Sequence, residues 1–235
     1  MTENRTYLQP AYILRQCSYR ESSLIMEAFT RDFGRISVLA KGVRKAKSKS
    51  RGLLQPFIPL RLTFIGKAEL KTLTDVELAE PFRPISGKAL YCGFYLNELI
   101  AAFLHKDDPH PELFADYRRC LTDLQQEGLL DPVLRNFELD LIEKTGYGLH
   151  LAYEGYRGKP VDPVEKYHLD TDLSPIRAED GIYSGKTLLA MQSRNFADAE
   201  VLAEAKMLLR RVLDALLHGK PLNSRKVLND IIKRL

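Results

Sequence analysis

A run of cations without acidic neighbours is the clearest chemical feature of this sequence. Residues 33–68 contain nine Lys or Arg side chains and no Asp or Glu. Six of the nine fall within residues 41–51, namely Lys41, Arg44, Lys45, Lys47, Lys49 and Arg51. Cations at this density neutralise phosphates and release condensed counterions, which is the main source of sequence-independent affinity for nucleic acids. We therefore expect an exposed basic loop that binds a polyanion; the alternative is a solubilising loop, although solubilising surfaces usually mix both signs of charge.

Charge is also divided unevenly along the chain. Residues 1–80 carry 14 basic and 8 acidic side chains, and residues 81–235 carry 21 basic and 23 acidic, although the net charge of the whole chain is only +4. This segregation predicts different partners for the two parts. A second, weaker phosphate-contacting surface near the C-terminus would include Arg210, Lys220 and Arg225, for which solvated helix faces are the alternative.

Side chains suited to catalysis or metal binding form one cluster, at residues 105–110. Its histidines and aspartates could bind a divalent ion and serve a metal-dependent nuclease, but their spacing favours a polar loop between two helices. The sequence has no phosphate-binding loop, nucleophile elbow or zinc-protease motif. Its three cysteines are scattered, which predicts reduced thiols in the cytoplasm. We expect no enzymatic activity, no cofactor and no bound metal.

Strands in the first 80 residues would position the basic run. Short β-type segments at residues 11–16, 24–30, 35–40, 57–65 and 70–78 are punctuated by glycines. Five such strands predict a small closed barrel of the OB type, although the pattern alone does not separate it from an SH3-like barrel. Alternation places Arg35 and Arg61 on the face opposite the apolar residues, where they could contact phosphates.

Aromatic side chains in this region are candidates for stacking on bases, as in many nucleic-acid-binding barrels. Tyr7, Tyr19 and Phe33 lie near predicted strand ends or turns. Phe29 and Phe64 alternate with apolar residues instead, so we expect them in the core.

From residue 86 onward the apolar period becomes helical. It predicts helices at residues 89–104, 113–125, 131–146 with Asp131 as the N-cap, 198–218 and 224–234. Residues 153–184 are irregular, with a short hairpin near residues 166–169. The most apolar segment, residues 89–104, is too short and too polar to span a bilayer, and no signal peptide is apparent. The fold class is α+β, with a barrel domain at residues 1–80 and a helical domain at residues 81–235.

Several short motifs and their order along the chain resemble those of the bacterial RecO family, the recombination mediators of DNA repair. The matching segments are SSLIM at residues 22–26, FGRISVLAKGVR at 33–44, LQPF at 54–57, LYCGFYLNEL at 90–99, LRNFEL at 134–139, GYG at 146–148 and GKPLNSR at 219–225. Each motif is weak by itself, but together they cover nearly the whole chain in the family's order.

The resemblance implies an OB barrel followed by a helical domain with a zinc-finger-like insertion at about residues 151–184. It implies binding of single- and double-stranded DNA, annealing of complementary strands, and assistance to RecA in displacing single-strand-binding protein in the cytoplasm, at the nucleoid. RecR and single-strand-binding protein are the implied partners. A general RNA- or ribosome-binding barrel protein is the alternative.

Two expectations concern the second part of the chain. Many relatives have four cysteines in the insertion, but residues 151–184 contain none, so we expect no zinc and packing through Tyr153, Tyr156, Tyr167 and Tyr183 instead. The family's tail-binding helix corresponds in position to the segment containing Leu134, Arg135, Phe137 and Leu139. We expect Arg135 to pair with the carboxylate of the acidic C-terminal tail of single-strand-binding protein.

Overall fold

The computed structural model describes residues 5–126, 129–155 and 158–232. The chain divides into two compact units, one formed by Met1–Gln125 with Leu222–Leu235 and the other by Gln126–Pro221. The sequence predicts a division near residue 80, where strands give way to helices, and that domain boundary stays a prediction. The compact units divide at other points, because three helices after residue 80 belong with the strands.

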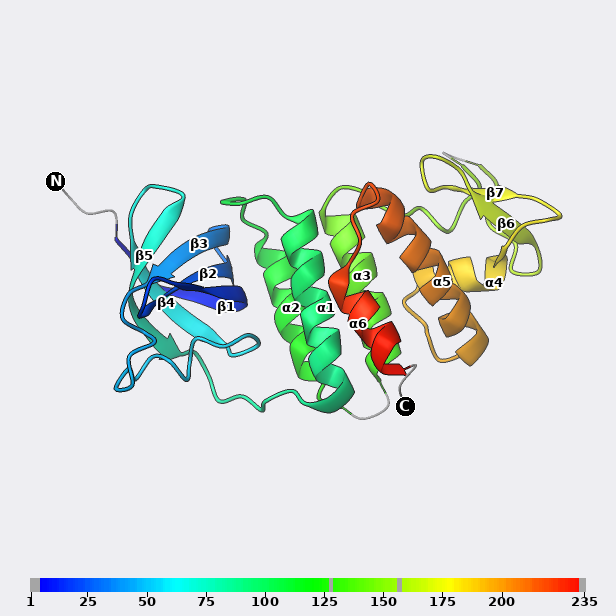
Figure 1. The fold of residues 1–235 in the computed structure, drawn as a ribbon. Helices are drawn as coiled ribbons and strands as arrows, with labels where there is room; N and C mark the ends of the chain where they lie inside the picture. Colours follow the sequence, from blue (N-terminus) through cyan, green and yellow to red (C-terminus); the bar gives the residue numbers. More distant parts are fainter. Residues whose placement is uncertain (1–4, 127–128, 156–157, 233–235) are drawn as a thin grey trace. The chain divides into compact units, whose positions relative to one another are not determined.

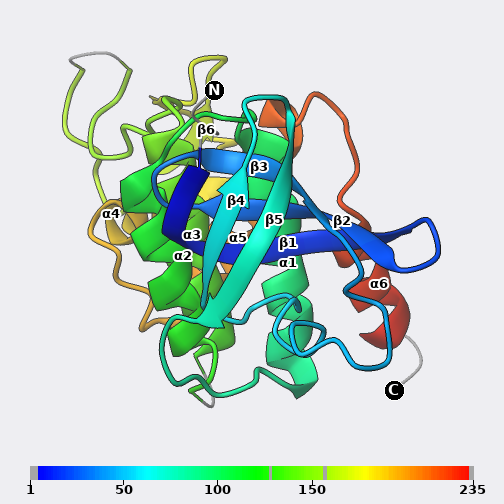
Figure 2. The ribbon, with the colours of Figure 1, turned by 90° about the vertical axis from the view of Figure 1, so that its left-hand side faces the viewer.

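The first unit contains a closed five-stranded barrel (Figures 1 and 2). Its strands are β1 (Arg5–Tyr19), β2 (Ser23–Thr30), β3 (Gly34–Ala40), β4 (Leu60–Ile65) and β5 (Leu70–Leu78). They close in the order β1-β2-β3-β5-β4, with β3 and β5 parallel and the other pairs antiparallel. This confirms the OB-type barrel. β1 is much longer than predicted because it pairs with β2 along one part and with β4 along another.

The barrel interior follows the alternation in the sequence. Ile36, Val38 and Ala40 of β3 are buried in one apolar cluster, and Phe64 of β4 joins them, as predicted. Phe29 is also fully buried, but its ring lies against Phe114, with a centroid distance of 5.3 Å. Phe114 belongs to a helix outside the barrel, so the strands bury side chains on both faces at this point.

Three helices complete the first unit, namely α1 (Gly87–Phe103), α2 (Pro111–Asp123) and α6 (Asn223–Ile232). Asn97 of α1 is buried and donates to the Leu14 carbonyl at 2.8 Å. The pairing of β1 with β2 shifts register between Ile13 and Arg15, which leaves Leu14 at the irregularity. Since a bulged residue lacks its regular ladder partner, the Asn97 amide takes that place. Tyr117 of α2 donates to Asn97 at 2.5 Å, so one polar side chain joins three elements.

Glu98, the next residue of α1, holds the start of α6. Its carboxylate accepts hydrogen bonds from the backbone N–H groups of Asn223 and Ser224 at 2.8 and 2.9 Å. The Ser224 hydroxyl also donates to it, at 2.6 Å. The first N–H groups of a helix have no partner within the helix, so the carboxylate supplies the N-terminal cap from another element.

The loop between α1 and α2 lies along β3. The Asp107 N–H donates to the Arg35 carbonyl at 2.9 Å, and the Asp107 carboxylate pairs with Lys71 at 2.6 Å. Gly34 has a φ of +62°, and a Cβ built on it would lie 1.9 Å from the Asp108 carbonyl oxygen. Only glycine allows the two backbones to approach so closely.

The second unit contains α3 (Leu130–Lys144), α4 (Gly185–Gln192) and α5 (Ala199–Leu216), with a small sheet of β6 (Lys166–Leu169), β7 (Pro175–Arg177) and β8 (Tyr183–Ser184). The sheet order is β7-β6-β8, so the predicted hairpin has a third strand. α4 was not predicted from the sequence. The predicted N-cap of α3 is wrong, since Asp131 lies inside the first turn and Leu129 is the N-cap.

Two of the four insertion tyrosines form the predicted packing. Tyr167 and Tyr183 are buried, and the Tyr167 hydroxyl accepts a hydrogen bond from the Asp162 N–H at 2.8 Å. Tyr153 is 52% exposed, so its predicted role in the packing is wrong. Tyr156 lies outside the described residues. Within the described part of the chain, no helix combines the length and apolar character needed to cross a membrane.

Candidate nucleic-acid interface

The connection between β3 and β4 carries the predicted basic loop. It consists largely of turns, and all six of its cationic side chains between residues 41 and 51 are exposed. Val43 and Leu54 belong to the barrel core, so the connection is anchored near both ends of the basic run. The Arg44 N–H also donates to the Ser22 carbonyl at 2.9 Å, which ties the loop to the start of β2. The result is a set of exposed cations on a firmly attached segment.

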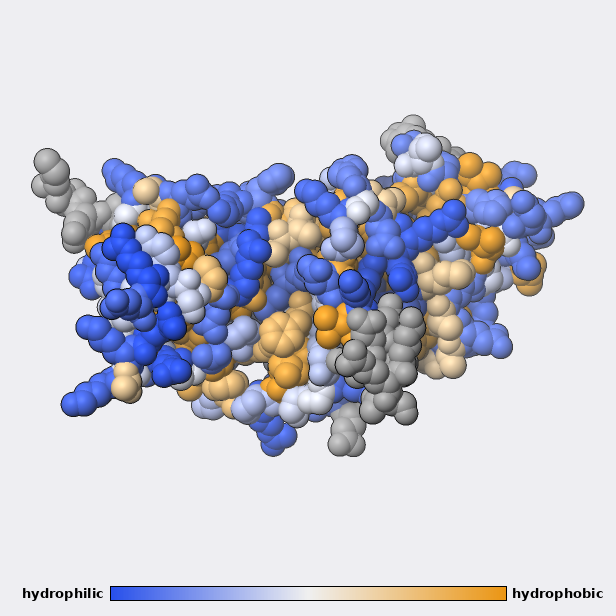
Figure 3. Space-filling view, in the orientation of Figure 1, coloured by the Kyte–Doolittle hydropathy of each residue, from blue (hydrophilic) through white to orange (hydrophobic). Residues whose placement is uncertain are grey.

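None of these six cations forms an ion pair with a carboxylate of the described residues. Other exposed lysines do so: Lys186 pairs with Asp198 at 2.5 Å, Lys206 with Asp131 at 2.9 Å, and Lys106 with Glu69. A cation without a carboxylate partner has no such contact to lose when it binds a phosphate. Figure 3 shows strongly hydrophilic surface over part of the β3–β4 connection, whereas the surface over the barrel strands mixes hydrophilic and hydrophobic residues.

The two predicted cations on the strands have acidic partners. Arg35 of β3 has an 11% exposed side chain and pairs with the buried Glu27, which also pairs with Arg15 at 2.5 Å. Burial lowers the pKa of Arg35, while the Glu27 charge opposes that shift. Arg61 is 46% exposed and pairs with Glu77 at 3.2 Å. A phosphate contact by Arg35 stays a prediction, and it would require breaking a buried ion pair.

The three stacking candidates differ in exposure. Tyr7 is 66% exposed, and the Arg5 guanidinium lies 5.1 Å from its ring centroid. Phe33 is 36% exposed and contacts Phe64 edge-on, at a centroid distance of 5.7 Å. Tyr19 is half-buried beneath Arg20. Tyr7 thus offers the most open ring, next to a cation, for a base.

The predicted C-terminal cations do not form one site in a single unit. Arg210 and Lys220 are exposed in the second compact unit, and Arg225 belongs to the first. Arg225 donates to the Tyr95 hydroxyl at 3.2 Å and lies 5.5 Å from the centroid of its ring. Arg225 therefore holds α6 against α1, and a phosphate contact by any of the three stays a prediction.

The four residues predicted to bind a peptide tail are all buried. Arg135 is 5% exposed and pairs with Glu138 at 2.5 Å, one turn along α3. Leu134, Phe137 and Leu139 are 7%, 2% and 5% exposed. These residues do not form the accessible pocket that the hypothesis requires. The Arg135 Nε atom has no hydrogen-bond partner among the described residues, so its guanidinium is not fully satisfied.

The histidine and aspartate cluster at residues 105–110 serves the loop that lies along β3. Asp107 pairs with Lys71, and His110 contacts Asp108 at 3.2 Å. No group of three potential metal ligands occurs among the residues described by the structure. The Asp107 carboxylate thus attaches the loop to the barrel, and the Asp108 carboxylate contacts a residue at the start of α2.

Comparison with known proteins agrees with this architecture over nearly the whole chain. The family model described as Recombination protein O N terminal matches residues 1–82, and the one described as Recombination protein O C terminal matches residues 86–226. A DNA repair protein RecO from Nitrosospira multiformis is 40% identical over 234 residues, covering 97% of both chains. Proteins of the same name from Aromatoleum aromaticum and Methylococcus capsulatus are each 41% identical, covering 95% of this chain and 95% and 93% of their own. The chain therefore belongs to the RecO family of DNA repair proteins.

Proposed function

We propose that this protein binds single- and double-stranded DNA, anneals complementary strands, and assists RecA loading onto DNA coated with single-strand-binding protein. The observation that carries the proposal is the set of six exposed cations without carboxylate partners on an OB barrel. Family membership supports DNA rather than RNA as the ligand, because the relatives are named DNA repair proteins. The proposed place of action is the cytoplasm, at the nucleoid.

Annealing requires two polyanions to approach each other. A basic loop attached to a barrel lowers the repulsion between two phosphate backbones, and it does so without reading base edges. Binding should therefore tolerate any sequence and weaken steeply with salt. Charge neutralisation and positioning suffice for this function, and no bond is made or broken by the protein.

RecR and single-strand-binding protein are the proposed protein partners. For the acidic tail of single-strand-binding protein, Arg135 is a suitable contact only if its ion pair with Glu138 exchanges for a pair with the tail carboxylate. We expect Glu138→Gln to raise the affinity for a tail peptide and Arg135→Ala to lower it. If neither change alters the affinity while both proteins remain folded, the tail binds elsewhere.

The proposed function is tested by annealing two complementary oligonucleotides precoated with single-strand-binding protein, without ATP. We expect the wild-type protein to accelerate annealing and a variant with all six loop cations changed to alanine to lose most of that acceleration. Double-stranded DNA and RNA of equal length provide competitors that rank the ligands. No acceleration by the wild-type protein, or stronger competition by RNA than by DNA, would refute the proposal.

A further inference from the structure

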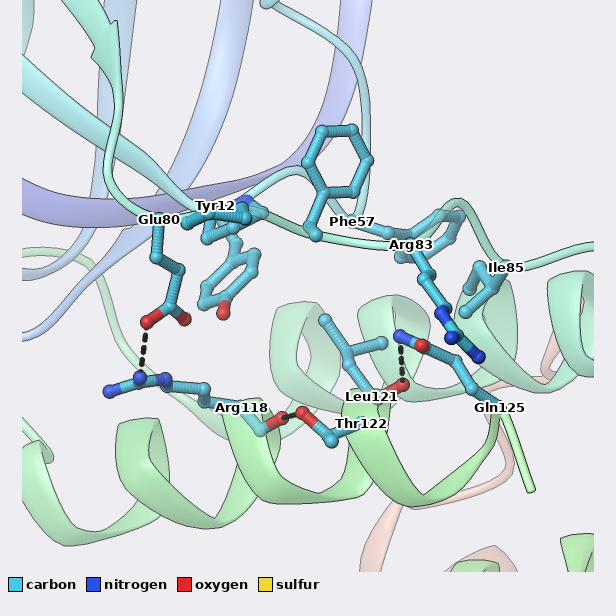
Figure 4. A pocket seen from close by; sticks show the side chains of 12 residues that line it. Tyr12, Phe57, Glu80, Arg83, Ile85, Arg118, Leu121, Thr122 and Gln125 are labelled. Atoms are coloured by element: carbon cyan, nitrogen blue, oxygen red, sulfur yellow. Dashed lines mark hydrogen bonds and ion pairs between the residues drawn. The ribbon is translucent and has the colours of Figure 1, made fainter.

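A cavity of about 400 Å³ in the first compact unit was not recognised from the sequence. It lies between the barrel, the segment that follows β5, and helix α2 (Figure 4). Aromatic rings and prolines contribute flat apolar walls, among them Phe57, Pro59, Pro81 and Phe82. Its size falls in the range of pockets that hold small ligands.

Polar groups occupy both ends of the cavity, as Figure 4 shows. At one end, Glu80 pairs with Arg118, next to the Tyr12 hydroxyl. Burial, together with the Glu80 charge, raises the pKa of Tyr12 to about 12; a tyrosine hydroxyl is protonated at neutral pH with or without this shift and can donate a hydrogen bond there. At the other end, the Arg83 side chain extends toward Gln125. The cavity thus combines flat apolar walls with donors and acceptors.

Arg83 and Gln125 retain unused capacity to bind a ligand. Arg83 is exposed and has no ion pair or hydrogen bond to any described residue. The Gln125 amide donates to the Leu121 carbonyl only at 3.4 Å, a long contact for a hydrogen bond. A ligand could therefore take a charged contact from Arg83 and a paired donor and acceptor from Gln125 without breaking a short bond.

The backbone at Phe57 is unusual for an aromatic residue. Phe57 has a φ of +69°, in the left-handed region that bulky residues rarely adopt. Helix α1 accommodates its ring, because a Cβ at Gly93 would lie 2.9 Å from the Phe57 Cε1 atom. Phe94 holds the ring from the side, at a centroid distance of 5.1 Å. Strained backbone that neighbouring elements enforce often occurs at binding sites.

The cavity also lies close to the basic loop along the chain. Phe57 follows Arg51 by six residues in the same β3–β4 connection. These six residues span at most about 20 Å when fully extended. A polyanion on the loop cations would thus have its next units within reach of Arg83 and the cavity. The loop and the cavity together suit a ligand that carries negative charges at short intervals and a flat apolar group at each interval. A nucleic-acid strand has both features.

We propose that this cavity binds one unstacked base of single-stranded DNA, with its phosphate at Arg83. The base would contact the Phe82 ring and the proline surfaces, and its edge would face Gln125. This inference rests on the proposed DNA binding, which supplies the ligand. Sequence tolerance is retained because every base has a flat face, while Gln125 can present either its donor or its acceptor.

The test compares two oligonucleotides of equal length and charge, a thymidine strand and a strand without bases. Fluorescence anisotropy gives both dissociation constants for the wild-type protein and for Phe82→Ala, Thr122→Phe and Tyr147→Ala. Phe82 is 37% exposed and Thr122 is exposed on α2, so both changes are compatible with folding. Thr122→Phe fills the cavity, and Tyr147→Ala removes a ring of similar exposure, 46%, in the second compact unit.

We expect the wild-type protein to prefer the thymidine strand by about 5- to 150-fold, the range of one stacked base. Phe82→Ala and Thr122→Phe should lose most of this preference while binding the strand without bases normally, and Tyr147→Ala should retain it. Equal affinity of the wild-type protein for both strands would overturn the base pocket and leave the proposed DNA binding intact. Binding to neither strand would instead refute the proposed function. A preference that survives both cavity variants would place the stacking elsewhere, with the Tyr7 ring the next to test.

Discussion

The salt dependence of DNA binding should report directly on the basic loop. Each phosphate neutralised on a single strand contributes about −0.7 to the slope of log affinity against log salt. If all six loop cations engage phosphates, the wild-type slope is about −4, and affinity falls roughly 300-fold between about 50 and 200 mM salt. Changing Lys45, Lys47 and Lys49 to alanine should reduce the slope to about −2 and the loss to roughly 20-fold. Fluorescence anisotropy with a labelled oligonucleotide at several salt concentrations measures both slopes.

A matched control separates the loop from net charge. Lys106, Lys186 and Lys206 are also exposed lysines, but each pairs with a carboxylate. Changing these three to alanine removes the same total charge and should leave the slope near its wild-type value. The reasoning would be refuted if the two triple variants changed the slope equally, because long-range charge rather than local contact would then explain the binding. A wild-type slope near zero would exclude phosphate neutralisation altogether.

Three further predictions concern the scaffold of the first unit. Gly34→Ala should lower the free energy of unfolding by about 3 kcal/mol or more. Gly42→Ala should lower it by only about 1 kcal/mol, because Gly42 also has a positive φ (+70°) but its nearest neighbour atoms are 3.9 Å from an added Cβ. Equal losses of the two variants in urea denaturation would contradict the close backbone approach at Gly34. Asn97→Leu should lower the free energy of unfolding by about 2–4 kcal/mol, because it removes the hydrogen-bond partner of the buried Leu14 carbonyl and of the Tyr117 hydroxyl. In a double-mutant cycle, adding Tyr117→Phe should recover part of that loss. Folding raises the pKa of Tyr12 from its ordinary 10.0 to about 12. The contribution of the protonated hydroxyl to the free energy of unfolding is therefore complete below pH 10 and is lost as pH rises toward 12. Tyr12→Phe should therefore flatten the fall in unfolding free energy over that range, and identical pH profiles for the two proteins would contradict the shift.

Local patterns in the sequence predicted the elements that have a strong period or a strong cap. β3 alternates cleanly between buried and half-buried residues, and both β3 and β5 appear within one residue of their predicted bounds. The start of α5 was predicted at Asp198, whose carboxylate accepts hydrogen bonds from the N–H groups of Glu200 and Val201. α4 escaped prediction because it has only eight residues, too few for a clear helical period. It is held by Ser184, which accepts from the Thr187 N–H and donates to Glu204 of α5, a contact across 20 residues.

The basic loop and the barrel that carries it follow from patterns among neighbouring residues. The loop cations are exposed and without carboxylate partners in part because no acidic residue occurs in the 36-residue segment that contains them, residues 33–68, a property that is visible in the sequence. The strand alternation likewise follows from a period of two, which depends only on neighbouring residues. Charge composition and alternation are local quantities, so reading them requires no knowledge of the fold.

The availability of polar side chains and the position of the cavity depend instead on how distant segments pack together. Arg35 and Arg135 appear as free cations in the sequence, but the fold leaves the Arg35 side chain only 11% exposed and buries Arg135, beside Glu27 and Glu138 respectively. The cavity with Arg83 draws its walls from segments around residues 12, 57, 80–85 and 118–125, which no local pattern connects. Burial and ion pairing depend on which distant segments meet in space, and that is decided by the packing of the whole unit.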